Sequence, residues 1–133
     1  MIIGFSFVVF AVGCSSPPEE FGTLAEEMER VERGLGIDCE GSRSPRVVKC
    51  DWGIWLRRGR DSGFVTDVEI TEKTASIDRL VELARVYGFS KDQVERLMTT
   101  EVDLELAGDF RLSHRSNFQP ADGGGRYYIE AEE

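Results

Sequence analysis

This 133-residue chain contains three cysteines, Cys14, Cys39 and Cys50, and these are the side chains that can take part in the most kinds of reaction. A thiol can form a disulfide, bind a metal or carry a covalent group, and its surroundings decide which. No two of them are spaced as Cys-x-x-Cys, and the single histidine, His114, lies far along the chain. The spacing therefore does not favour a zinc site, and attachment of a group and disulfide formation remain.

Cys14 follows an apolar run, MIIGFSFVVFAVG, that contains no charged side chain. A transmembrane helix needs about 20 apolar residues, and this run is too short. One interpretation is a buried strand that ends in a loop at Ser15-Ser16-Pro17-Pro18. The other is the apolar region of a secretory signal, which spans about 7–15 residues and ends at small residues.

Residues Ala11-Val12-Gly13-Cys14 resemble the lipobox of bacterial lipoprotein precursors, in which an apolar residue and two small or apolar residues precede an obligatory cysteine. The resemblance implies cleavage after Gly13 by signal peptidase II and a diacylglyceryl thioether on Cys14. Ser15 rather than aspartate follows the cysteine, which implies the outer membrane in a two-membrane bacterium. A signal without lipid is the alternative.

With Cys14 assigned to lipid, Cys39 and Cys50 remain as an even pair in an exported domain, which is typical of a disulfide. Residues 41–46 between them, GSRSPR, are turn-forming. Two short strands joined by this loop would place the thiols opposite each other. The alternative is two buried free thiols in a cytosolic protein.

Hydrophobic periodicity predicts an α+β fold, an antiparallel sheet packed by helices in the order α-βββ-αα-βββ. The first helix lies within residues 19–36, with a capping box at Thr23 and Glu26, and it ends at Gly34 and Gly36. The other predicted elements are a helix pair within 76–99 and strands at 47–52, 54–58, 64–71, 101–106, 110–114 and 126–131.

Two strands give specific expectations about facing. In strand 64–71, one face is expected to carry Phe64, Thr66, Val68 and Ile70. In strand 101–106, the apolar residues Val102, Leu104 and Leu106 alternate with the acidic residues Glu101, Asp103 and Glu105. We expect the acidic face of that strand to be solvated.

No catalytic group is expected. His114 follows Ser113 directly, and neighbours in a strand point to opposite faces, so the two cannot form a nucleophile–base pair. Asp103 and Glu105 are better explained as a solvated strand face than as paired catalytic carboxylates. The chain contains no phosphate-loop, dinucleotide or metal-ligand pattern. We therefore expect no enzyme and no cofactor.

Trp52 and Trp55 flank Gly53-Ile54, close to the presumed disulfide. Side chains three apart in a regular strand point to opposite faces, so we expect one tryptophan in the core and one exposed. A bulge at Gly53 would change this facing. An exposed tryptophan beside Arg57 and Arg58 is the predicted contact surface for an envelope protein or glycan.

Residues 83–97, LARVYGFSKDQVERL, resemble the helix-turn-helix of bacterial transcription regulators. The matching positions are Ala84, Gly88, Phe89, Ser90 and Val94. The resemblance implies a regulator or adaptor that uses residues 76–99. The charges disfavour nucleic acid, because Lys91 and Arg96 are offset by Asp92 and Glu95 and the net charge of the chain is −9.

These patterns divide the chain into a signal peptide at 1–13, a lipidated Cys14 with a polar tether at 14–20, and one α+β domain at 21–133. The predicted function is a small lipoprotein of the cell envelope, held at the membrane by its lipid and serving as a non-enzymatic binding or structural module. The helix-turn-helix regulator or adaptor is the alternative.

Overall fold

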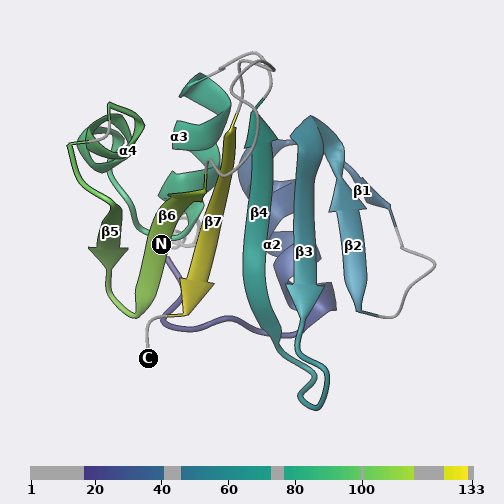
Figure 1. Ribbon diagram of the computed structural model, residues 1–133. Helices are drawn as coiled ribbons and strands as arrows, with labels where there is room; N and C mark the ends of the chain where they lie inside the picture. The colour runs from purple at the N-terminus through teal and green to yellow at the C-terminus, as the bar shows by residue number, and fades with distance from the viewer. Residues whose placement is uncertain (1–16, 41–45, 73–76, 100, 116–124, 132–133) are drawn as a thin grey trace, which may run out of the picture.

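The computed structural model shows a seven-stranded sheet with helices packed on one of its faces (Figure 1). The structure describes residues 17–40, 46–72, 77–99, 101–115 and 125–131. The strand order is β1-β2-β3-β4-β7-β6-β5, and every neighbouring pair is antiparallel. The predicted α+β class is confirmed.

The sheet consists of two antiparallel ribbons that join where β4 pairs with the last strand, β7. The strands are β1 (Cys39–Glu40), β2 (Val47–Cys50), β3 (Ile54–Arg58), β4 (Val65–Glu72), β5 (Leu104–Ala107), β6 (Phe110–Arg115) and β7 (Gly125–Ala131). The two-residue β1 is additional to the predicted order, and the other elements follow it.

The first helix, α2 (Leu24–Leu35), has both predicted end signals. The Thr23 hydroxyl accepts a hydrogen bond from the Glu26 N–H, and the Glu26 carboxylate accepts one from the Thr23 N–H. Gly36 ends the helix in the left-handed region, with φ of 68°, a conformation that glycine adopts at little cost. Gly34, by contrast, lies inside the helix.

The predicted helix pair forms α3 (Ile77–Val86) and α4 (Lys91–Met98). Gly88 separates them with φ of 98°. Ser90 and Gln93 make a second complete capping box at the start of α4. Each box satisfies backbone donors that a helix start would otherwise leave unpaired.

The core lies between the sheet and the helices. Leu56, Val68, Ile129 and Leu112 occupy one register row across β3, β4, β7 and β6, and each is at most 1% exposed. Val31 of α2 is fully buried over this side of the sheet. Full burial of such an aliphatic side chain contributes about 1.5–3 kcal/mol, so this row is a main source of stability.

The prediction that Trp52 lies in a strand is wrong, because the chain reverses direction at Asp51–Gly53 and β2 and β3 form a hairpin. Trp52 and Gly53 both have positive φ, 70° and 71°, which folds the chain back within three residues. Trp52 and Trp55 are both half-buried, and of the two only Trp52 packs against the hydrophobic core.

The predicted alternation in β4 holds only for part of the strand. Val68 and Ile70 are buried, but Phe64 is 55% exposed and Val65 is buried instead. A register irregularity opposite Arg57 and Arg58 is the reason, since it changes which side chains face the helices before Val68.

The expected facing of β5 is reversed. Leu104 and Leu106 are 42% and 49% exposed, and Glu105 instead points toward α4. The carboxylate of Glu105 is satisfied there by side chains of α4, and this allows a charged residue on the helix side of an edge strand.

Candidate binding surface on the open face of the sheet

The face of the sheet opposite the helices is turned toward the viewer in Figure 1, with α2 behind it. The register places one row of side chains across this open face. The row consists of Glu40, Lys49, Trp55, Glu69, Tyr128, Ser113 and Leu104. A second row consists of Val47, Arg57, Asp67, Glu130, Arg111 and Leu106.

Glu69 is the centre of the open face. Although it lies opposite the helices, it is only 4% exposed, because neighbouring side chains cover it. Arg57 Nη2 donates to its Oε1 at 2.5 Å, Thr71 Oγ1 donates to its Oε2 at 3.2 Å, and Arg126 Nε lies 3.8 Å from Oε2. The buried carboxylate fixes the position of the Arg57 guanidinium, and the more exposed Arg126 lies at ion-pair distance from it.

Arg57 also binds Asp67, with Nη1 at 2.9 Å from Oδ2. Burial lowers the pKa of Arg57, but the hydrogen bonds that its guanidinium donates to Glu69 and Asp67 outweigh that effect, so the pKa lies above its usual value. Arg111 and Glu130 form a further pair at 3.1 Å. The charged groups of the open face are therefore fixed in place by one another.

Two aromatic side chains flank Glu69 in the first row, Trp55 on β3 and Tyr128 on β7. They lie two strand spacings apart, about 10 Å. The ammonium group of Lys49 lies 5.5 Å from the centre of the Trp55 ring, which is cation–π distance. Trp55 and Tyr128 are both half-buried, so each keeps part of its surface in solvent.

The structure divides the four residues predicted as a contact surface. Trp55 and Arg57 share the open face. Arg58 Nη1 instead donates to the carbonyls of Gly59 and Ser62 in the β3–β4 turn. Trp52 lies in the opposite turn, with the Arg79 guanidinium 5.3 Å from the centre of its ring.

Tyr128, Arg126 and Glu69 also belong to this surface, although their positions in the sequence did not predict it. A signal was present, because Asp67, Glu69 and Thr71 alternate with apolar residues and belong to the polar face of a half-buried strand. The alternation alone does not tell which strand pairs with β4 or in which register. The pairing with β7 places Tyr128 beside Glu69.

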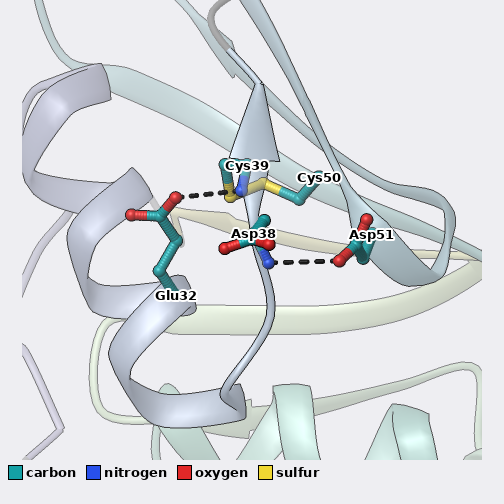
Figure 2. Close-up of a disulfide and its surroundings, with 5 residues drawn as sticks. All are labelled: Glu32, Asp38, Cys39, Cys50 and Asp51. Atoms are coloured by element: carbon teal, nitrogen blue, oxygen red, sulfur yellow. Dashed lines mark hydrogen bonds between the residues drawn. A yellow bond between two sulfur atoms is a disulfide. The ribbon is translucent and has the colours of Figure 1, made fainter.

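The Sγ atoms of Cys39 and Cys50 lie 2.00 Å apart, at disulfide distance, between directly opposite residues of β1 and β2 (Figure 2). Glu32 of α2 accepts a hydrogen bond from the Cys39 N–H at 2.9 Å. Asp51 accepts one from the Asp38 N–H at 3.2 Å. The cysteine pair thus joins the edge strand β1 to the sheet. Cys14 lies outside the described residues.

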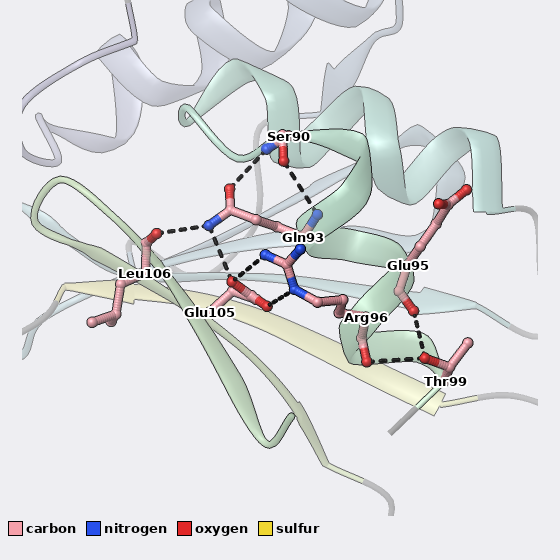
Figure 3. A network of polar contacts seen from close by, with 7 residues as sticks. All are labelled: Ser90, Gln93, Glu95, Arg96, Thr99, Glu105 and Leu106. Atoms are coloured by element: carbon pink, nitrogen blue, oxygen red, sulfur yellow. Dashed lines mark hydrogen bonds and ion pairs between the residues drawn. The ribbon is translucent and has the colours of Figure 1, made fainter. Parts of the chain in front are cut away.

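A corner joins α3 and α4 at Gly88, with Ala84, Phe89 and Val94 buried. On α4, however, Arg96 is engaged: its Nε and Nη2 donate to Glu105 at 3.0 and 3.3 Å (Figure 3). These hydrogen bonds lower the pKa of Glu105. Gln93 donates to Glu105 and to the Leu106 carbonyl, so α4 covers part of the edge of β5.

His114 is half-buried and stacks on Tyr127, with 4.7 Å between ring centres, and burial lowers the pKa of His114.

A shallow depression of about 310 Å³ at the end of α4 is lined by Asp92, Glu95, Arg96, Thr99 and Glu101. Among the described residues, no three His, Cys, Asp or Glu side chains are placed to hold a metal ion. No helix in the described part of the chain is long and apolar enough to cross a bilayer.

Comparisons of the chain with protein families, with curated proteins and with solved structures gave no match. The open face, the cysteine pair and the sequence around Cys14 are therefore the observations from which a function is argued.

Proposed function

We propose that the protein is a small lipoprotein of the cell envelope that binds another envelope protein through the open face of its sheet. The observation that carries the proposal is the row Trp55–Glu69–Tyr128 beside Arg57 and Arg126. Tryptophan, tyrosine and arginine are the residue types that contribute most to protein–protein binding energy.

The fixed geometry of this surface supports binding. Glu69 and Asp67 hold the Arg57 guanidinium in place, so little side-chain freedom is left to lose when a partner docks. Fixed charges of both signs also select a partner with the complementary pattern. A glycan is the other candidate ligand, since sugars also stack on aromatic rings, but the paired charges favour a protein.

Two features support placement in the envelope. The sequence Ala11-Val12-Gly13-Cys14 resembles a lipobox, and the Cys39–Cys50 pair suits an oxidising compartment. Labelled palmitate should enter the wild-type protein in its native host and should be absent from Cys14→Ser. Wild-type protein without label would refute the lipid anchor.

Binding through the open face is tested by photo-crosslinking in the native host. A photoreactive amino acid at Lys49, next to Trp55, should give a discrete protein adduct. The same group at Glu82, which is exposed on α3, is the matched control and should give none. Trp55→Ala should weaken the Lys49 adduct. Equal adducts at both sites would contradict the proposal, and an adduct removed by glycan-degrading enzymes but not by protease would assign a glycan partner instead.

A regulator or adaptor that uses residues 76–99 is the second candidate, favoured by the well-formed corner at Gly88. Its test is binding to duplex DNA at moderate salt, with dependence on Lys91. The guanidinium of Arg96 is already paired with the carboxylate of Glu105 and is therefore not available to a DNA phosphate. We expect no such binding.

A further inference from the structure

We name residues 17–22 the strap: this segment follows the proposed lipid site and is held against the domain at its downstream end by Phe21 and Gly22. Phe21 is 7% exposed and makes edge-to-face contacts with Tyr87 and Phe110, with 5.6 and 4.8 Å between ring centres. Such pairs contribute about 0.5–1.5 kcal/mol each beyond the area that they bury. Phe21 is therefore part of the core, whereas Pro17, Glu19 and Glu20 upstream of it are exposed and Pro18 is half-buried.

Hydrogen bonds fix the downstream end of the strap. The Gly22 N–H donates to Glu27 Oε2 at 2.7 Å, and the Gly22 carbonyl accepts from the Val65 N–H at 2.8 Å. Glu27 is fully buried and is itself held by the Tyr87 hydroxyl at 2.6 Å and by Arg30 Nε at 3.0 Å. The strap is thus joined both to the helices and to β4.

The upstream end of the strap, Pro17, lies at one flank of the molecule. A Cβ added to Gly88 would lie 3.4 Å from Pro17 Cβ and 3.8 Å from Ala107 Cβ. Pro17 therefore lies beside both the α3–α4 turn and the last residue of β5. The exposed leucines Leu104 and Leu106 belong to the same edge strand.

The short distance in sequence from Cys14 to Pro17 limits how far this flank can lie from a lipid anchor. Three residues span at most about 11 Å. Trp55, on β3, lies four strand spacings from β5, or about 19 Å. An anchor at Cys14 therefore holds the β5 edge much closer to a bilayer than the Trp55 end of the sheet.

We propose that one flank of the domain faces a phospholipid bilayer; this flank consists of Pro17, Gly88, Ala107, Leu104 and Leu106. The β5 edge of the sheet then lies next to the membrane. The Trp55 end of the open face points away from the membrane. This inference rests on the proposed lipid anchor. The net charge of −9 gives no general attraction to an anionic membrane, so the strap rather than surface charge sets the orientation. The exposed leucines suit contact with the bilayer interface.

Paramagnetic relaxation tests the orientation without altering the fold. The mature chain, which begins at Cys14, is coupled through the Cys14 thiol to a maleimide lipid in nanodiscs that contain a gadolinium-chelating lipid. Cys39 and Cys50 do not react while their disulfide is intact. Amide relaxation should be several-fold faster at Gly88, Ala107 and Gly108 than at Lys49 and Trp55. Equal enhancement at both ends, or the largest enhancement in the 59–64 turn, would overturn the proposal.

A linker variant provides the control. A flexible Gly-Ser segment of about 20 residues inserted between Ser16 and Pro17 has an r.m.s. span of about 25 Å, so the difference between the two ends of the sheet should disappear while the fold is retained. A difference that persists would mean that the strap does not set the orientation. Chemical coupling makes this test independent of palmitate labelling in the native host, so failure of the lipid anchor and failure of the orientation are distinguishable.

Discussion

At the scale of single residues, Glu27 is the buried carboxylate that links the downstream end of the strap to the helices. Its carboxylate is fully buried and accepts hydrogen bonds from Gly22, Arg30 and Tyr87. Burial, and then the negative charge of Glu27, raise the pKa of Tyr87 well above its usual value, so the tyrosine stays a neutral donor. Among the described residues, no buried side-chain polar atom lacks a partner.

Glu27→Ala should lower the free energy of unfolding by about 2–4 kcal/mol, because it leaves the Tyr87 hydroxyl buried without an acceptor and removes a charged partner of Arg30. Urea denaturation measures this loss. The matched control is Glu29→Ala on the same helix, whose ion pair with Arg33 is exposed and should change stability by less than about 1 kcal/mol. Equal losses in the two variants would show that the buried network has no special role.

At the scale of elements, the contact between α4 and β5 predicts a pH dependence. Hydrogen bonds from Arg96 are the main cause of the lowered pKa of Glu105. A carboxylate with a depressed folded-state pKa stabilises the protein above its unfolded pKa, near 4.5, and this contribution is lost as pH falls through the folded-state pKa.

Glu105→Gln should therefore unfold at lower urea concentration than the wild type near neutral pH, and the two midpoints should converge as pH falls through the depressed folded-state pKa of Glu105. A series of urea midpoints from neutral to acid pH measures the difference. A gap that stays constant over the whole range would show that ionisation of Glu105 is not the cause.

The reversed facing of β5 gives a second test at this scale. Leu104→Thr and Leu106→Thr should each change stability by about 0.5 kcal/mol or less, because both leucines are largely exposed. Leu112→Ala on the adjacent strand should cost about 2–5 kcal/mol, since Leu112 is fully buried. A large loss at Leu104 would instead indicate that the leucines face the core, as their alternation alone suggested.

How far the sequence predicts an element depends on the range of the contacts that decide it. The capping box at Thr23 was predicted because its partner, Glu26, lies three residues away. The facing of β5 was not, since it depends on Gln93 and Arg96 of another element that satisfy Glu105. The hairpin turn at Trp52 was also not predicted. A positive φ at tryptophan is uncommon, and the local sequence pattern is that of a continuing strand.

The same distinction applies to the candidate site. Trp55 and Arg57 were identified from their residue types, which is information that the sequence contains. Tyr128 and Arg126 join them only through the pairing of β4 with β7, and that register is set by the whole sheet.

At the scale of the whole molecule, the Cys39–Cys50 bond closes a loop with a sequence separation of 11 residues. In the chain-entropy model a loop of this size contributes about 3 kcal/mol. The double variant Cys39→Ala, Cys50→Ala should lose about that much in urea unfolding, and reductant should lower the wild-type midpoint but not that of the variant. An unchanged wild-type midpoint in reductant would contradict a stabilising disulfide.

The proposed anchor, strap and open face together describe a domain with a defined orientation. The anchor at Cys14 would hold the β5 edge near the bilayer, the strap would limit how far the domain can turn, and Trp55 and Arg57 would face away from the membrane toward a partner. Each of these steps depends on the chemistry of Cys14.

The most direct measurement is therefore the intact mass of the protein purified from membranes of its native host. The account predicts a chain that begins at Cys14, carries the added mass of a diacylglyceryl group, and has no free thiol at Cys39 or Cys50. A chain that retains residues 1–13 without lipid, or that shows two free thiols, would contradict it.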